Sequence, residues 1–323
     1  MTEKEIKKEY PQLFPYKVEN EGKNENPDNN LLKKQNPPNA SKNKQVSKKN
    51  NNRKLQVSRS HLFEFNHFAR VLDILYENSK LKKITRNFLI ENSGLPDGQV
   101  ASIISIGSSL ELINTGTQTL TPTGLLIAKN DIFIEKIGTL EWCHYKGAGS
   151  YKNLIWYEVF NNLLKDNPGM NQESWEEYFS NKLKGNYTEK TIHDHIPKET
   201  RFIIDAYING NFRKLEILRI SSDKRFYANQ YLKIKPLIFC SMIYDFCQEK
   251  GTGVCQIIDI LETLGSPAYV FGMDLNSFKQ QIEILHNNGW LRYETTHDLD
   301  QIRIKADLSA IDFLKAYYEN KKL

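Results

Sequence analysis

Two short runs of the sequence contain side chains that could move a proton or hold a metal ion. Glu141 and His144 stand three residues apart, with Tyr145 next to them. On a helix this spacing places the carboxylate and the imidazole on one face. Glu158 follows downstream. The pair could bind a divalent metal or act in acid–base catalysis, or His144 could be a hydrogen-bonded structural residue; both interpretations stay open.

The second run is His193–Asp194–His195. Neighbouring residues on a helix point in different directions, so these three meet at one ion only if the segment is extended. Asp194 could equally cap a helix ahead of Pro197. A nuclease needs two or more carboxylates clustered on its metal, with Mg²⁺ or Mn²⁺ as the candidates here, and the sequence does not show which distant Asp or Glu side chains meet.

The common short motifs of catalysis and metal binding are absent from the sequence. The run GTGVCQ (251–256) lacks the Lys-Ser/Thr of a phosphate-binding loop, and there is no HExxH, GxSxG or DxDxDG. The cysteines have no CxxC spacing, so we expect small buried apolar side chains and neither a zinc site nor disulfides. These residues are Cys143, Cys240, Cys247 and Cys255.

Positive charge is concentrated near the N-terminus. The net charge is +5, and residues 33–59 contain nine basic side chains and no acidic one. Residues 1–58 are rich in Asn, Lys, Pro and Gln, which predicts a disordered basic arm, with an aromatic run at residues 10–18 that could dock on the body or a partner. Such an arm either attracts DNA through counterion release or only solubilises the protein. The arm residues that we expect on DNA are Lys48, Lys49, Arg53 and Lys54.

No apolar run approaches the roughly 20 residues that cross a bilayer. The first ten residues, MTEKEIKKEY, have no apolar stretch behind their charges, unlike a secretory signal. We therefore expect a soluble, cytoplasmic protein with no membrane partner.

Apolar spacing and turn residues predict a mainly α-helical fold with minor β-structure. A winged-helix module is expected at each end, with a helical region between them that includes two short strands at residues 215–220 and 225–227. The expected domains are a basic arm (1–58), a first winged helix (59–130), a helical middle (131–233) and a second winged helix (234–323).

In the first module, three helices precede a two-stranded wing that leads into LTPTG (120–124). The third helix of such a module usually enters the major groove. This one lacks Arg and Lys, so the module either contacts DNA with help from the preceding helix or binds a protein. Its candidate DNA-binding residues are Lys82, Lys83 and Arg86 on the second helix, and Gln99, Ser102, Ser105 and Ser109 as outward positions on the third.

In the second module, a helix begins at Pro236, a second one lies within residues 255–272, and a third is capped by Asp274 and ended by Asn288–Gly289. A hairpin wing follows around residues 295–300. Because cations are present here, we expect this module to be the main duplex-binding one. Its candidate DNA-binding residues are Ser277, Lys279, Gln280 and Gln281 on the third helix, and Arg292, Arg303 and Lys305 on the wing.

From the first wing into the middle region, the sequence carries a set of moderately specific motifs. On these it resembles a bacterial family, domain of unknown function 4007, which is found beside DNA phosphorothioation genes and whose best known members are the SspB proteins of an antiphage system. The similarity extends over roughly residues 61 to 310. The matching positions are Leu120–Gly124, Asp131, Phe133, Ile134, Glu135, Thr139, Leu140, His144, Trp156, Tyr157, Phe160 and Asn161.

The sequence departs from the family pattern in two places. Glu141 stands where the pattern has Trp, and SGLPDGQV (93–100) replaces a GVGKN-like run, which removes a Lys from the supposed DNA face. The resemblance implies a partner of the sulfur-modification machinery, and SspB-type members are assigned DNA nicking. Glu135 and His144 are the candidate catalytic residues because they match recurring positions.

The leading hypothesis is a component of a DNA phosphorothioation or related phage-defence system that binds double-stranded DNA. Metal-dependent nicking is its enzymatic form, and other proteins of the sulfur-modification system are expected partners. One alternative is a non-catalytic winged-helix transcription factor or adaptor, which would bind a defined site without breaking strands. Another is a protein-interaction scaffold, whose DNA affinity would be negligible and insensitive to salt.

Overall fold

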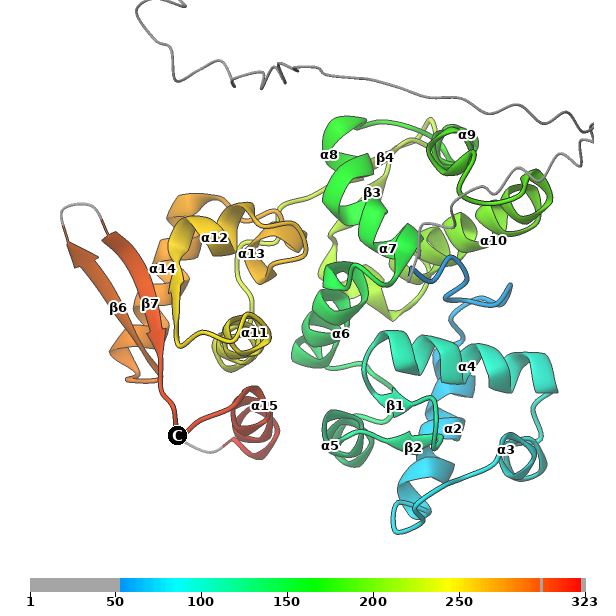
Figure 1. Cartoon of the computed structure of the whole chain (residues 1–323), viewed down its shortest axis with the longest axis horizontal. Helices are drawn as coiled ribbons and strands as arrows, with labels where there is room; N and C mark the ends of the chain where they lie inside the picture. The colour runs from blue at the N-terminus through cyan, green and yellow to red at the C-terminus, as the bar shows by residue number, and fades with distance from the viewer. Residues whose placement is uncertain (1–52, 297–298, 321–323) are drawn as a thin grey trace, which may run out of the picture. The chain divides into compact units, whose positions relative to one another are not determined.

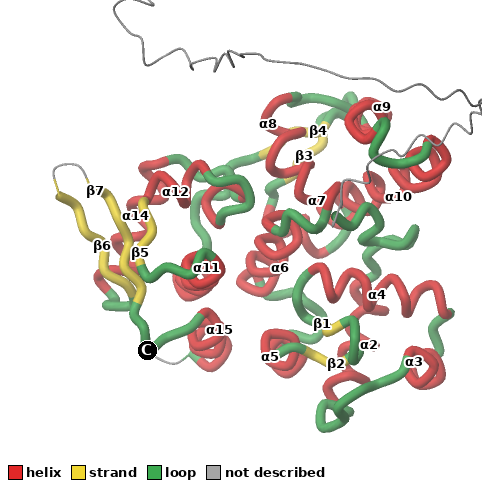
Figure 2. Tube along the Cα trace, viewed as in Figure 1, coloured by secondary structure: helices red, strands yellow, loops and turns green. Residues whose placement is uncertain are grey.

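The computed structural model describes residues 53–296 and 299–320. They form a mainly helical fold with small antiparallel sheets, as Figures 1 and 2 show, which confirms the predicted fold class at this level. No helix in these ranges is long and apolar enough to cross a membrane. Lys48, Lys49 and the aromatic run at residues 10–18 lie outside the described residues.

The first elements are three helices followed by a two-stranded antiparallel sheet, in the order expected for residues 59–130. Thr85 caps the second helix with its side chain, and Gly94 ends it in the left-handed conformation, as predicted. The elements are α2 (Phe65–Glu77), α3 (Arg86–Ser93), α4 (Asp97–Ser109), β1 (Ile113–Asn114) and β2 (Thr119–Leu120).

The run Leu120–Gly124 turns the chain from β2 into α5 (Pro122–Asn130). The hydroxyl of Thr121 accepts a hydrogen bond from the Gly124 N–H and donates one to the Glu111 carbonyl. A Cβ at Gly124 would collide with the backbone of Leu112. The residue types of this motif are therefore explained by a helix cap and a close backbone approach.

The middle region is helical and contains one short hairpin. Its predicted strands are confirmed, although the first begins at Leu218 because a 3₁₀ turn occupies Asn211–Leu215. Asp194 lies inside a helix that Thr188 caps and that continues through Pro197. The elements are α6 (Ile137–Gly149), α7 (Leu154–Glu158), a π-helical turn (Val159–Leu163), α8 (Leu164–Asp166), α9 (Gln172–Leu183), α10 (Glu189–Ile208), β3 (Leu218–Ile220) and β4 (Phe226–Ala228).

The last region contains a three-stranded antiparallel sheet of order β5-β7-β6. Asp274 caps the long helix that begins at Leu275 by accepting a hydrogen bond from the Ser277 N–H, as predicted. The expected second helix is instead a strand and two short helices. The elements are α11 (Pro236–Glu249), β5 (Val254–Gln256), α12 (Ile257–Glu262), α13 (Pro267–Val270), α14 (Leu275–Asn287), β6 (Leu291–Thr296), β7 (Leu299–Ile304) and α15 (Ala310–Glu319).

Helix α6 lies at the centre of the described region and is buried from Gly138 to Ala148. It packs against α7, α11 and α13, and α15 connects the first and last regions by packing on both α5 and α11 (Figure 1). The four cysteines are buried and free, which confirms their predicted role as small apolar side chains. Residues of α6 are therefore placed where the first, middle and last regions meet.

The predicted arm ends too late in the sequence. Leu55, Val57 and Ser58 are buried. The Val57 and Ser58 N–H groups donate hydrogen bonds to the Glu199 carboxylate, and Lys54 forms a parallel β-bridge with Asn153. The polar composition of residues 1–58 did not indicate these contacts, because only two buried apolar side chains and a few hydrogen bonds attach this short segment to the body.

Candidate functional site

Helix α4 does not present the expected DNA-binding face. The side chains of Ser102, Ser105 and Ser109 are buried, and Gln99 is half-buried. Ser102 Oγ donates to the Ser58 carbonyl and Ser105 Oγ to the Val57 carbonyl, each at 2.6 Å. The expectation that these serines point outward is therefore wrong, because the segment before α2 covers that face of the helix.

The arm residue Lys54 and the cations expected near the first module are partly engaged within the protein. Lys54 Nζ donates to the Ser105 carbonyl, and burial lowers the pKa of this ammonium to about 8. Arg86 forms a bidentate ion pair with Asp97. Lys82 and Lys83 are exposed. Of these four, only the two adjacent lysines are left available to an anionic partner.

In the second module, the exposed part of α14 is smaller than expected. Gln280 is exposed and Ser277 is half-buried. Gln281 is buried and donates to the Leu232 carbonyl, so its expected outward position is wrong. Lys279 forms an ion pair with Asp300, which ties α14 to the hairpin.

The hairpin carries its basic residues on one outer face. Arg292 and Arg303 are direct partners across β6 and β7, and Glu294 on the same face contacts both. The two arginine side chains remain 71% and 50% exposed. Lys305, just after β7, is also exposed. The structure therefore brings together two of the predicted DNA-binding cations, Arg292 and Arg303, and leaves both of them and Lys305 exposed.

His144 lies in the protein interior. Its Nδ1 is 2.5 Å from the Tyr207 hydroxyl and its Nε2 is 3.1 Å from the Val270 carbonyl. Burial lowers the pKa of this imidazole to about 4, so the ring is neutral at physiological pH. Phe160 and Phe271 pack edge-on against it. Both nitrogens are occupied, which favours the structural interpretation.

Glu135 and Glu141 also take part in local structure. The Glu135 N–H donates to the Asp131 carboxylate. Glu141 is buried and accepts hydrogen bonds from the Tyr231 hydroxyl and the Lys235 N–H, so it holds the connection into α11. Burial raises the pKa of Glu141 to about 7.

The run at His193–Asp194–His195 does not gather its side chains at one point. The three residues lie on α10, His193 is exposed, and its Nδ1 is 3.4 Å from the neighbouring Asp194 carboxylate. This placement fits the interpretation of a solvated helix surface.

A pocket of about 630 Å³ lies where the three regions meet at the end of α6. Its volume falls within the range of about 300–1,000 Å³ that small-molecule sites occupy. The sequence did not predict this site. Its lining residues are Arg53, Glu111, Tyr145, Lys146, Gly149, Ser150, Tyr151, Lys152, Phe246, Glu249, Leu264 and Gly265.

Lys146 is the central charge of the pocket and is only 5% exposed. Its ammonium contacts Glu111 at 2.9 Å, Asp245 at 2.6 Å and Glu249 at 3.4 Å. Burial opposes the charge, but the three carboxylates outweigh it and hold the pKa of Lys146 above its usual value. The lysine is therefore a fixed cation inside an acidic group.

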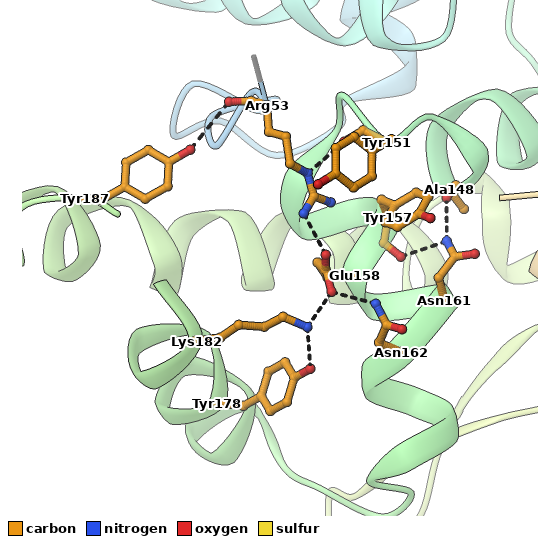
Figure 3. A network of polar contacts seen from close by, with 10 residues as sticks. All are labelled: Arg53, Ala148, Tyr151, Tyr157, Glu158, Asn161, Asn162, Tyr178, Lys182 and Tyr187. Atoms are coloured by element: carbon orange, nitrogen blue, oxygen red, sulfur yellow. Dashed lines mark hydrogen bonds and ion pairs between the residues drawn. The ribbon is translucent and has the colours of Figure 1, made fainter. Parts of the chain in front are cut away.

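Arg53 forms the second charged contact of the pocket, shown in Figure 3. Its Nη1 lies 2.7 Å from Glu158 Oε1, and its Nε donates to the Tyr151 carbonyl. The guanidinium carbon is 3.9 Å from the Tyr151 ring centroid, a cation–π arrangement. Glu158 also accepts from Lys182 and from Asn162. The Tyr151 ring therefore packs on the Arg53 guanidinium and edge-on against Tyr157, with 5.4 Å between the two ring centroids, and Tyr151 is still 62% exposed.

Two glycines allow the loops that line the pocket to touch. A Cβ on Gly149 would lie 2.7 Å from the Gly265 carbonyl oxygen, and Gly265 has a φ of +82°. Asn161 joins the same loops: its Oδ1 accepts from the Gly265 N–H and its Nδ2 donates to the Ala148 carbonyl. The recurring Asn161 thus has a structural role beside the pocket.

The pocket does not fit the expected Mg²⁺ or Mn²⁺. Glu111, Asp245 and Glu249 already share the Lys146 ammonium, which occupies the position where a cation would lie. Within residues 53–296 and 299–320, no group of three or more His, Cys, Asp or Glu side chains is arranged to hold a metal ion.

The sequence indicated Tyr145 as a candidate residue but gave no indication of its neighbour Lys146. Asp245 and Glu249 lie 99 and 103 residues further along the chain, so their contact with Lys146 leaves no local pattern. The small residues at 147–149 were the available signal, because they permit a close approach at the end of a helix.

Comparisons with known proteins give a family and a fold. No curated protein matches the chain. Two solved structures, described as "Magnesium ion-bound SspB crystal structure" and "SspB crystal structure", match with a TM-score of 0.63 at 13% and 14% identity, over 81% of this chain and 86% of theirs. The TM-score shows that this chain shares their fold, and at identities this low the similarity shows the fold alone. A family described as a protein of unknown function (DUF4007) matches residues 100–318, which include α6, the pocket lining other than Arg53, and the hairpin, and the chain belongs to this family.

Proposed function

We propose that this protein is a DNA-binding component of a DNA phosphorothioation or related phage-defence system. The similarity of its fold to SspB supports the setting. The observation that carries the DNA contact is the direct pairing of Arg292 with Arg303 on the exposed face of the hairpin. Like charges directly opposite each other destabilise a sheet, and one carboxylate, Glu294, balances only half of this pair. An anionic partner such as a phosphate backbone would supply the remaining charge.

The topology of the last region supports a winged-helix assignment. A helix (α11), a strand (β5), short helices, the long helix α14 and the β6–β7 hairpin follow one another, and β5 pairs with β7. We infer that residues 234–323 form a winged-helix module in which α14 and the hairpin meet the duplex. In the first region three helices also precede a hairpin, but because α4 is covered we propose that this region acts as a structural or protein-contact module.

The arm and the second module differ in their balance of basic and acidic side chains. Residues 1–58 hold thirteen basic and seven acidic side chains, whereas residues 234–323 hold nine basic and twelve acidic ones. Non-specific affinity for phosphates follows the number of cations that meet them. We propose that the arm supplies most of the affinity and that the hairpin positions the duplex.

If the protein is also an enzyme, the activity that fits this proposal is nicking of the bound DNA. His144 is enclosed and both of its ring nitrogens are engaged, which does not favour nicking by this residue. Gel shifts of the full chain on a short duplex across salt concentrations test DNA binding, and relaxation of supercoiled plasmid with Mg²⁺ or Mn²⁺ tests nicking. We expect salt-sensitive binding and intact plasmid. Strand breaks that survive in His144→Ala would show catalysis by other residues, and negligible, salt-insensitive binding would support the scaffold alternative.

A further inference from the structure

The Lys146 pocket, defined by the lining residues above, combines an exposed aromatic ring with polar groups of both signs. An aromatic platform beside cations is a recurring way to hold an unstacked base, because every base has a π-face. We propose that the Lys146 pocket accepts a single base displaced from a DNA helix. This inference rests on the proposed DNA-binding function and adds a second contact on the same DNA.

Tyr151 is the stacking surface. One side of its ring contacts the Arg53 guanidinium, which the Glu158 carboxylate holds in place (Figure 3). The ring is 62% exposed although it belongs to a well-anchored loop. A ring already held against the guanidinium loses little conformational entropy on binding, so most of the favourable free energy of stacking a base on it is retained.

The acidic rim selects which part of a nucleotide enters. Glu111 and Glu249 contact Lys146, yet their side chains remain 52% and 62% exposed. Carboxylates repel a phosphate and accept hydrogen bonds from an exocyclic amino group, as they do with cytosine N4. The base therefore points inward, and an amino-bearing base is preferred to thymine.

The rim also offers a place for the backbone. Lys152 is exposed at the pocket edge, next to Tyr151 in the chain. A phosphate attached to the stacked nucleotide can meet this ammonium while it remains outside the acidic interior. Leu264 and Phe246 add apolar contact within the same pocket.

The test compares the affinity of the full chain for three short duplexes: a perfectly paired one, one with a bulged cytosine and one with a bulged thymine. An unpaired base has already lost its pairing, so a protein that holds a displaced base spends less free energy on the bulged duplexes. We expect the cytosine bulge to bind about tenfold tighter than the paired duplex, which corresponds to about 1.4 kcal/mol. The thymine bulge should fall between them.

Substitutions identify the pocket as the cause. Tyr151→Ala should reduce the preference for the bulge to within about twofold and leave the affinity for paired duplex nearly unchanged, since stacking contributes only when a base is displaced. Tyr151→Phe should keep the preference because it keeps the ring. Glu249→Gln should reduce the difference between cytosine and thymine. Phe133→Ala, an exposed aromatic residue outside the pocket, is the matched control and should behave as wild type.

Two results separate this inference from the proposed function. If wild type binds the three duplexes equally, or if Tyr151→Ala keeps the preference, the pocket inference is overturned while DNA binding stands. If none of the duplexes is bound even at low salt, the proposed function fails and the pocket inference fails with it.

Discussion

Ser58 and Glu199 are joined by hydrogen bonds across 141 residues of sequence. Ser58 Oγ lies 2.7 Å from Glu199 Oε1, and the N–H groups of Ser58 and Val57 donate to the same buried carboxylate. This contact fixes the segment that covers α4, and therefore determines that the first module does not present its third helix.

Replacing Glu199 should release this segment. Glu199→Ala leaves two buried N–H groups and a hydroxyl without partners, at a cost of about 1–3 kcal/mol for each buried group. We expect the free energy of unfolding, measured by urea denaturation, to fall by about 3 kcal/mol or more. Glu177→Ala, at an exposed position on α9, should change it by less than about 0.5 kcal/mol. Equal effects of the two substitutions would contradict the assigned contact.

Two truncations should behave differently. Removing residues 1–58 deletes the buried Leu55 and Val57 and strips Glu199 of its hydrogen-bond donors. Burial of each apolar side chain contributes about 1.5–3 kcal/mol. The melting temperature of the chain that begins at residue 59 should therefore be well below that of the chain that begins at residue 53, as measured by calorimetry. Matching melting temperatures would place the end of the arm at residue 58 after all.

Lys146 should stabilise the protein mainly by neutralising Asp245. Lys146→Met leaves a carboxylate in a largely buried position, and breaking a buried pair costs about 3–5 kcal/mol. Lys146→Met combined with Asp245→Asn should recover much of the loss, because neither charge then remains unpaired. Lys152→Met, at the exposed neighbouring cation, is the control. Additive losses in the double variant, measured by chemical denaturation, would show that the two residues do not interact.

Glu141 should make stability depend on pH in a defined direction. Its pKa is raised by burial from 4.5 to about 7, so the folded state favours the protonated form. The stability from this group is fully present below about pH 4.5 and is lost as pH rises through about 7, by an amount on the order of 3 kcal/mol. Glu141→Gln should remove that loss. Denaturation midpoints of the two proteins should converge in acid and diverge toward pH 8; parallel curves would refute the assignment.

The arginine pair of the hairpin should contribute to DNA affinity in a salt-dependent way. Arg292→Ala with Arg303→Ala removes two cations, and each lost phosphate contact lowers the slope of log K against log salt by about 0.9. We expect the slope to fall by about 1.8 in fluorescence anisotropy titrations. Lys198→Ala with Arg201→Ala removes the same charge from exposed positions on α10 and serves as the control. A similar decrease in the control would mean that net charge, not the hairpin, determines binding.

The sequence alone determined the elements that depend on neighbouring residues. The caps at Thr85, Gly94 and Asp274 follow from local hydrogen bonds and backbone conformation, and the structure confirms each. The Leu218–Ala228 hairpin, which alternation and turn residues predicted, is also confirmed. These interactions involve residues only a few positions apart, so the local sequence is enough to predict them.

The tertiary structure decided which polar side chains are buried and which charges meet. Ser102 and Gln281 look like outward residues in the sequence, but segments 44 and 49 residues away cover them. Lys146 meets Asp245 and Glu249 because α6 and α11 pack together at the centre of the fold. Burial and electrostatic pairing depend on elements that are distant along the chain and close in space. The local sequence pattern does not indicate which distant elements pack together.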